Sequence, residues 1–263
     1  MTSKTQTLRF LILSDTHGQD FFDDLEGESH WKQGDMPKAD VLELKLAIAG
    51  NHDISLDEDA STDPEMLQTH RKVVSMWTDD AAKAAGIHYL TEGFHTFTLN
   101  NGATFTIYAS PYTPEFNNWA FGYPRSDNHF GPLRNSRNRA ESSPAHDIVM
   151  THGPPHGFLD SAHGDHLGCH HLRDAVREAR PRLHCFGHVH EGAGAQRVDW
   201  DNNSLKTMSA SSPSLESPLL LTLENGQNCY PDHTVMVNAA MVDSRNEPVW
   251  RSPWVVDMEV VRN

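Results

Sequence analysis

The chain has few basic residues and no long apolar run. It contains 21 lysines and arginines against 36 aspartates and glutamates, and its formal net charge is −15 at pH 7. A large nucleic-acid surface is therefore not expected, because phosphate backbones bind where lysine and arginine accumulate. The start, MTSKTQTLRFLILSD, passes from a polar leader into a short apolar segment that stops at an acid. Neither a secretion signal nor a membrane contact is predicted from it.

Cysteine is also scarce, with Cys169, Cys185 and Cys229 as the three residues of this type. An odd number of cysteines cannot all pair, and their spacing resembles neither a disulfide framework nor a zinc knuckle. The thiols are expected to be free, which favours a cytoplasmic protein. The sequence gives no indication of the oligomeric state.

Histidine is abundant by contrast. The chain has 18 histidines in 263 residues, about three times ordinary usage, and many fall between His146 and His190. Metal or proton chemistry is therefore expected, although the excess alone does not choose a site. The length suits one large α/β domain, and no repeat or linker divides it, so residues 1–263 are predicted to form a single domain.

Short apolar runs alternate with helical patterns, which predicts an α/β fold. A hairpin is predicted around Asn100, Asn101 and Gly102, and the segment from Pro111 to Pro144 reads as a long loop over the site. Helices are predicted from Asp63 to Ala85 and from Leu167 to Ala179. The predicted strands are Leu8 to Leu13, Leu44 to Ala49, Phe94 to Leu99, Ala103 to Ala109, Asp147 to Met150, Arg182 to Phe186, Leu219 to Leu223 and Val235 to Met241.

Four short motifs, SDTHG, GNHD, THG and GHVH, each follow one of these apolar runs. Their ligand-type side chains are Asp15, His17, Asn51, His152, His188 and His190. In extended backbone, two residues separated by one point to the same side, so a single ion can meet both members of a D-x-H or H-x-H pair. One such pair is a weak signal, but four clusters at four strand ends favour a metal site. Oxygen and nitrogen ligands without thiolate favour Mn²⁺, Fe, Mg²⁺ or Zn²⁺.

These four motifs resemble the signature blocks of the calcineurin-like metallophosphoesterase superfamily. The stretches THGPPHGFLD and FGHVHEGAG are similar to its branch of metallophosphoesterase domain-containing proteins. The resemblance covers nearly the whole chain, from Leu8 to about Met241. It implies a four-layer α/β/β/α sandwich with a two-metal site at the strand ends and a small phosphorylated substrate.

The resemblance also implies roles for individual residues. Asp15, His17 and His190 would hold the first metal ion, and Asn51, His152 and His188 the second. His52 would be the catalytic residue that donates a proton to the leaving oxygen, and Asp53 would orient it.

One family block is missing between the first two motifs. The family normally carries a strand that ends in Gly-Asp, whose aspartate bridges both metals, but here the sequence reads PKADVLELKLAIAGNHD. The ten residues from Val41 to Gly50 supply one strand and not two with a crossover, which needs about a dozen residues. Asp35 follows a glycine, but no apolar strand precedes it. We therefore expect that one βα unit after the first strand is lacking and that the second metal position is weak or empty.

The function favoured by these observations is metal-dependent hydrolysis of a phosphoester, most simply a phosphodiester of a small nucleotide. The alternative is a catalytically impaired scaffold that binds a metal ion or a nucleotide. A nuclease is disfavoured by the negative charge.

Three further features have two readings each. The stretch HGDHLGCHH, residues 163–171, could be a separate zinc site, but a structural role is favoured because paired thiols are lacking. The aromatic residues from Tyr112 to Tyr123 could stack on a nucleobase or pack the loop onto the domain. Four arginines could steer phosphate, although a loop-stabilising role is favoured: Arg125, Arg134, Arg137 and Arg139.

Overall fold

The computed structural model describes residues 4–16, 43–60, 62–134, 147–208, 219–223, 232–242 and 251–262. The largest element within these ranges is a ten-stranded mixed sheet. Its strands are β1 (Lys4–Ile12), β4 (Gly93–Thr98), β5 (Ala103–Ser110), β8 (Ile148–Thr151), β11 (Leu183–Phe186), β12 (Gly194–Asp199), β13 (Ser204–Thr207), β14 (Leu219–Leu223), β15 (His233–Asn238) and β16 (Trp254–Arg262).

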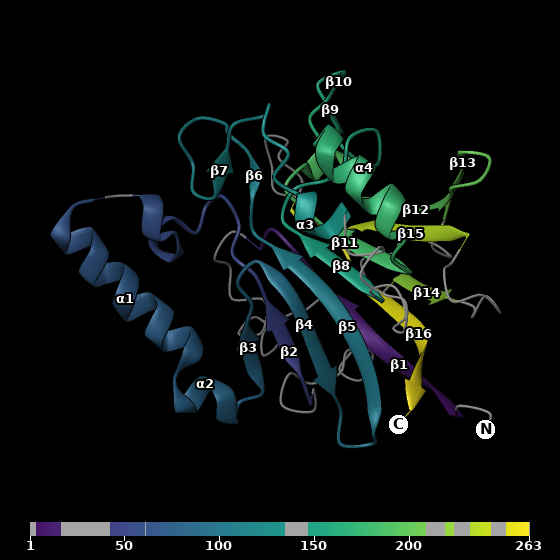
Figure 1. The fold of residues 1–263 in the computed structure, drawn as a ribbon, viewed down its shortest axis with the longest axis horizontal. Coiled ribbons are helices and arrows are strands. Elements are labelled where there is room, and N and C mark those ends of the chain that lie inside the picture. Colours follow the sequence, from purple (N-terminus) through teal and green to yellow (C-terminus); the bar gives the residue numbers. More distant parts are fainter. Residues whose placement is uncertain are drawn as a thin grey trace.

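Four parallel strands, β5, β8, β11 and β15, form the centre of this sheet. β4 pairs antiparallel with β5 through the predicted hairpin, in which Gly102 has a φ of 83°. β12 and β13 extend the other edge in antiparallel fashion. β16 joins β5 by a short antiparallel pairing at one end and carries β1 and β14 on its two sides. Strands from opposite ends of the sequence therefore pair, and the two labelled termini lie close together (Figure 1).

Alternation along the parallel strands divides their side chains between two cores. On one face, Phe105, Ile107 and Leu183 pack against Val256 and Met258 of β16. The opposite face is covered by helix α4 (His170–Ala179) and the short helix α3 (Gly131–Arg134). The apolar core between this face of the sheet and the two helices consists mainly of Tyr108, Val149, Met236, Leu172, Ala175, Val176 and Phe130.

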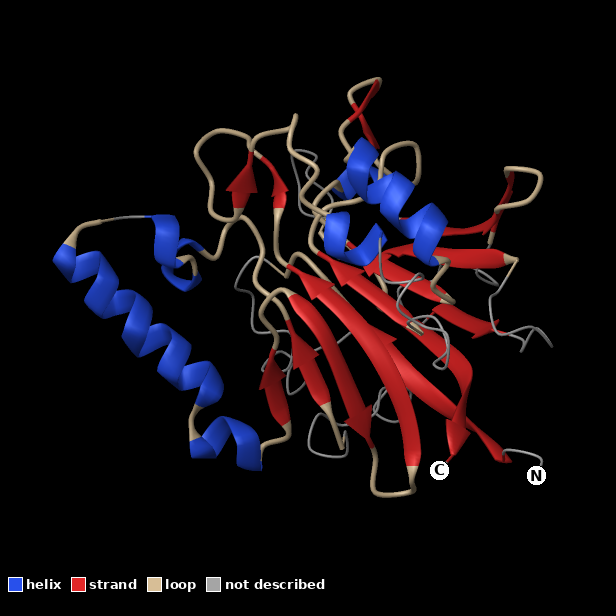
Figure 2. Cartoon of the chain, viewed as in Figure 1, coloured by secondary structure: helices blue, strands red, loops and turns tan. Residues whose placement is uncertain are grey.

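A second pair of helices lies apart from the first, as Figure 2 shows. Helices α1 (Pro64–Thr78) and α2 (Asp80–Ala84) pack beside the two-stranded parallel pair β2 (Lys45–Ala47) and β3 (Ile87–Tyr89). The chain is thus an α/β sandwich, as the resemblance implies. None of the helices in the described ranges combines the length and apolar character that crossing a bilayer requires.

Two predicted helices have different bounds in the structure. The prediction from Asp63 to Ala85 is wrong as one helix, because Asp79 has extended backbone and its carboxylate accepts the backbone N–H of Ala82, which starts α2. The prediction from Leu167 is wrong at its start, because β9 (Ser161–Ala162) and β10 (Asp165–His166) form a small hairpin there. Helix α4 begins only after Cys169, whose sulfur accepts the N–H of Leu172.

The strand predicted from Leu44 to Ala49 is shorter than expected and does not lie fully inside the protein. It is β2, Lys45–Ala47, and its three residues are half-buried. Leu13 at the end of the first predicted strand is 36% exposed. Residues of both strands line a cavity described below. The βα unit that is predicted to be lacking would follow β1, within residues 17–42, and these lie outside the described residues. Asp35, which follows a glycine as the metal-bridging aspartate of the family does, lies outside them as well.

Candidate metal centre

Four chain segments that follow strands meet at one place in the fold. Asp15 comes after β1, Asn51 after β2, His152 after β8, and His188 with His190 after β11. The end of β1 is fixed because Ser14 N donates to Ala239 O and Met241 N donates to Ser14 O, each at 3.0 Å. Gly187 N donates to His152 O at 3.0 Å and joins the segments after β8 and β11. Five of the six predicted metal ligands are thereby brought together, whereas His17 lies outside the described residues.

The first group of ligand-type side chains is centred on the amide oxygen of Asn51. His152 Nε2 lies 2.7 Å from Asn51 Oδ1, and His188 Nδ1 lies 3.1 Å from the same atom. The two imidazole rings are 4.9 Å apart between centroids. Asn51 and His152 are both buried, at 5% and 8% exposure. These three residues are the set that the resemblance implies for one metal ion.

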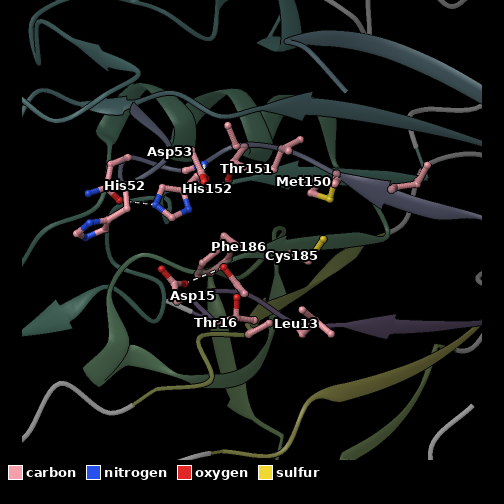
Figure 3. A pocket seen from close by; sticks show the side chains of 18 of the residues that line it. Leu13, Asp15, Thr16, His52, Asp53, Met150, Thr151, His152, Cys185 and Phe186 are labelled. Carbon is pink, nitrogen blue, oxygen red and sulfur yellow. Dashed lines mark hydrogen bonds between the residues drawn. The ribbon is translucent and has the colours of Figure 1, made fainter. Parts of the chain in front are cut away.

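The second group is centred on the carboxylate of Asp15. Its Oδ2 accepts hydrogen bonds from the Ser14 hydroxyl at 2.7 Å and from the backbone N–H of His188 at 2.8 Å. Its Oδ1 lies 3.5 Å from Nε2 of His190. Asp15 and His190 belong to the set implied for the other metal ion, whose third member is His17. The backbone N–H of His188 therefore connects the two groups. Figure 3 shows Asp15 and His152 facing the same pocket.

Charge states at the centre suit metal ligands. Burial lowers the pKa of His152 and lowers that of His188 to about 4, so both imidazoles are neutral at pH 7 and have a lone pair to donate. Burial by itself raises the pKa of Asp15, but the hydrogen bonds with His190, the N–H of His188 and the Ser14 hydroxyl, together with the positive charge that His152 acquires at low pH, hold it below its usual value. One carboxylate, one amide oxygen and three imidazoles form a donor set that fits a divalent cation.

Neither group is a complete site of three His, Cys, Asp or Glu side chains, and no such cluster occurs elsewhere in the ranges that the structure describes. Each group falls short of three such side chains for a different reason. The first depends on the amide of Asn51, and the second has Asp15 and His190 with its third implied member outside the described residues.

Backbone strain marks both groups. Asp15 has a φ of 54° and His188 a φ of 68°, and neither is glycine. Such left-handed backbone costs roughly 1–3 kcal/mol per residue, and seven further non-glycine residues in the described ranges also adopt a positive φ. The strained turns aim the Asp15 carboxylate and the His188 N–H at each other. The sequence gives no direct sign of these angles.

Two glycines, Gly50 and Gly187, allow the close packing. A Cβ added to Gly50 would lie 2.7–2.9 Å from the ring of His152. A Cβ added to Gly187 would overlap the Asp15 carboxylate and the Ser14 hydroxyl. Only a residue without a side chain fits either place.

We expect Gly187→Ala to displace the Asp15 carboxylate, to weaken the binding of a divalent cation such as Mn²⁺ by about 10–100-fold, and to reduce the free energy of unfolding by about 1–3 kcal/mol. Calorimetry with Mn²⁺ and urea unfolding would be measured side by side. Gly131→Ala is the matched control, because a Cβ there meets nothing within 4 Å. Unchanged metal affinity in Gly187→Ala would contradict the structural role given to this close contact.

His52, the predicted proton donor, lies at the mouth of the pocket rather than within either group. Its side chain lines the pocket with Asp15, Asn51 and His152, and its ring lies 4.3 Å from that of Trp119 between centroids. The Asp53 carboxylate accepts the backbone N–H of Gly50 at 2.7 Å and so closes the turn that carries Asn51. Figure 3 shows His52 at the same end of the pocket as His152.

The loop predicted from Pro111 to Pro144 contacts this site over its described part, residues 111–134. Ala120 N donates to Asn51 O at 3.1 Å, and Trp119 lies against His52. The loop contains β6 (Thr113–Pro114), β7 (Gly122–Tyr123) and α3. Tyr123 packs into the core beside α4, so packing of the loop aromatics onto the domain is confirmed for this residue. Sequence reasoning missed Trp119 as a neighbour of His52, since no local pattern marks it.

Residues of the stretch HGDHLGCHH and Arg125, for which a structural role is predicted, make hydrogen bonds that hold neighbouring loops. The buried Asp160 carboxylate accepts N–H groups of Gly157 and Gly168, each at 3.0 Å, and lies 2.6 Å from His166 Nδ1. Arg125 donates to the carbonyl oxygens of Leu167 and Gly168. A structural contact is thus shown for His166 and Gly168 of the stretch HGDHLGCHH and for Arg125. The structural role of the rest of the stretch stays a prediction. Arg137 and Arg139 lie outside the described residues.

Comparison with known proteins gives a family. Residues 28–192 match the family described as Calcineurin-like phosphoesterase. Metallophosphoesterase domain-containing protein 1 of Homo sapiens is 33% identical over 168 residues, which cover 58% of this chain and 46% of that protein. The protein of the same name from Mus musculus gives the same values. A protein of Emericella nidulans, described as probable rhamnogalacturonate lyase C, is 33% identical over 181 residues, which cover 68% of this chain and 15% of that protein.

The chain thus spans less than half the length of these relatives, so their complete activities do not transfer to it. The match to the family covers more than half of this chain and includes three of the four motifs, so it does show the family. The chain belongs to the calcineurin-like phosphoesterase family.

Proposed function

We propose that this protein is a metal-dependent phosphoester hydrolase that acts as a phosphodiesterase on small nucleotide-type substrates. The observation that carries the proposal is the convergence of Asp15, Asn51, His152, His188 and His190 from four separate strand ends. All five side chains are buried or half-buried, and hydrogen bonds connect most of them. Apolar residues at these positions would stabilise the fold at least as well, so a structural role alone does not explain them.

The residues of the centre have distinct roles in the proposed reaction. Asp15 and His190 would hold one divalent cation, and Asn51, His152 and His188 the other. Cations bound there would polarise a phosphoryl oxygen and lower the pKa of an attacking water. His52, at the pocket mouth, would donate a proton to the alcohol oxygen as the ester bond breaks. Trp119 would restrict the orientations of the His52 ring through their contact.

We expect His52→Gln to lower kcat/KM for a chromogenic phosphodiester by about 100-fold or more in the presence of Mn²⁺, with bound metal unchanged. His95→Gln is a matched control, because His95 lies on β4 away from the pocket and its Nε2 contacts the carbonyl oxygen of Thr91. The assay also separates the alternative function. Absence of turnover in the wild type, with retained nucleotide binding measured by calorimetry, would support a scaffold instead of an enzyme.

We also expect the purified protein to retain one tightly bound divalent cation and to lose the other on dialysis. The Asp15 group supplies a single carboxylate for both positions, and two facing cations repel each other unless negative charge lies between them. Metal analysis after dialysis measures the stoichiometry. Two equivalents retained through dialysis would show that a bridging ligand is present after all.

A further inference from the structure

The pocket at the metal centre is much larger than a phosphoryl group needs. Its volume is about 720 Å³, within the range of about 300–1,000 Å³ typical of small-molecule sites. It lies between the end of β1 and the segment of β2, above the parallel strands β8 and β11.

The pocket lining is divided into a polar end and an apolar end. The polar end holds Asp15, Asn51, His52, Asp53 and His152. The apolar end is formed by the strand bodies that precede these residues: Ile12, Leu13, Leu46, Ile48, Met150, Cys185 and Phe186. Figure 3 shows this separation, with His52 and Asp53 toward one end and Leu13, Met150 and Cys185 toward the other.

Strand geometry explains the arrangement. Met150 lies in β8, and His152 comes two residues later, just after the strand ends. Both side chains therefore point to the same face of the sheet. A molecule whose phosphoryl group lies at His152 would therefore extend along β8 over Met150. Its remaining part would meet mainly apolar side chains, with the Tyr89 hydroxyl as a polar group on the pocket wall.

Several apolar residues that line the pocket are partly exposed. Leu13 and Trp77 both line it and are 36% and 37% exposed. Ile12 in β1, Leu46 in β2 and Ile48 just after β2 are half-buried, although the apolar runs to which they belong predict buried strands. Covering such surface with an apolar group is favourable by the free energy of burial, whereas the hydroxyl groups of a ribose would lose water there without compensation.

Charge points the same way. Among the described residues that line the pocket there is no lysine or arginine, and Asp15 and Asp53 are acidic. Burial, together with Asp53 and Asp57, raises the pKa of Tyr89 to about 12, so its hydroxyl on the pocket wall stays neutral. A chain of several phosphates has no basic residue to bind here, whereas a single phosphoryl group needs only the metal ligands.

We infer that the substrate is a phosphoester with a single phosphoryl group at Asp15 and His152 and an apolar alkyl or aryl group in the pocket between β1 and β2. The inference rests on the proposed function and narrows it from small phosphodiesters in general to those with an apolar ester group.

Binding of two inert phosphonates tests the inference without turnover. Hexylphosphonate is expected to bind at least tenfold more tightly than methylphosphonate, measured by calorimetry on Mn²⁺-loaded protein, because five additional methylene groups are buried. In Leu13→Glu the advantage of the hexyl chain should fall below about threefold. Leu205→Glu is the matched control, since Leu205 is 51% exposed on β13, outside the pocket lining. Equal affinities for the two phosphonates, or loss of the advantage in both variants, would overturn the inference.

If Leu13→Glu does not fold, Trp77→Ala provides the second variant, because Trp77 lines the pocket from the exposed helix α1. Kinetics then separate failure of the inference from failure of the proposed function. The expected order of kcat/KM is hexyl, then methyl 4-nitrophenyl phosphate, then thymidine 5′-(4-nitrophenyl phosphate). Faster turnover of the thymidine ester would overturn the inference and keep the proposed function. Absence of turnover with all three would remove the proposed function, and the phosphonate affinities would still decide whether the pocket binds an apolar chain.

Discussion

Replacing Asp15 by asparagine is expected to abolish metal-stimulated phosphodiester hydrolysis, with a fall in kcat/KM of about 1,000-fold or more. Asp15 is the one carboxylate among the predicted ligands, and its side chain is only 5% exposed. Its pKa lies below the usual value through the balance of burial against hydrogen bonds and nearby histidines, so it is ionised at pH 7. Asparagine keeps the shape but removes the negative charge that offsets the cations.

The measurement combines the chromogenic assay with metal analysis of the same preparation. Asp63→Asn is the matched control, because Asp63 caps α1 by accepting the N–H groups of Glu65 and Met66, and asparagine caps equally well. Metal content should fall in Asp15→Asn and stay constant in Asp63→Asn. Retention of more than a tenth of the wild-type activity in Asp15→Asn would remove Asp15 from the proposed machinery.

The sequence predicted the strands and the place of the site well because both depend on local patterns. The apolar runs that become β1, β8 and β11 are short and end at polar motifs, so the ends of three strands could be assigned directly. The hairpin at Gly102 followed from turn chemistry in the same way. Parallel strands in one sheet present their carboxyl ends at one edge, which is why the motifs could be expected to meet.

Other features depend on tertiary contacts that no local pattern contains. The left-handed backbone of Asp15 and His188 is held by packing between segments 173 residues apart. Trp119 reaches His52 from a loop without periodicity. The half-buried state of β2 follows from the cavity beside it, whereas its composition predicts a fully buried strand. Sequence reasoning therefore located the donors but not the space next to them.

The largest effect expected on stability concerns a histidine outside the metal centre. His184 lies in β11 with 0% exposure, and its Nε2 is 2.9 Å from the Thr151 hydroxyl oxygen. That hydroxyl donates its proton to Gly153 O at 2.7 Å, so it must accept from His184 Nε2. Nδ1 of His184 is buried and has no hydrogen-bond partner among the described residues. A proton added at Nδ1 would therefore carry its charge into the core without an acceptor.

Burial lowers the pKa of His184 from 6.5 to about 3. Between these two values the unfolded chain binds a proton at this residue and the folded chain does not. The stability that neutral His184 contributes is therefore complete above pH 6.5 and is lost as the pH falls toward 3. Well below pH 6.5 each pH unit costs about 1.4 kcal/mol. Because the residue is already half protonated in the unfolded chain at pH 6.5, the fall from pH 6.5 to pH 4.5 should cost about 2 kcal/mol from this residue.

Urea unfolding of metal-free protein at pH 6.5 and pH 4.5 tests this expectation in the wild type, in His184→Gln and in His163→Gln. Glutamine retains an N–H group for Thr151 but does not titrate, so His184→Gln should lose about 2 kcal/mol less than the wild type between the two pH values. Other acid-sensitive groups, Asp15 among them, affect the proteins equally and cancel in the difference. His163, whose side chain is 88% exposed, should leave the wild-type pH dependence unchanged when replaced. Equal losses in the wild type and His184→Gln would mean that the imidazole is protonated within the fold, and the hydrogen bond from His184 to Thr151 would then need a different assignment.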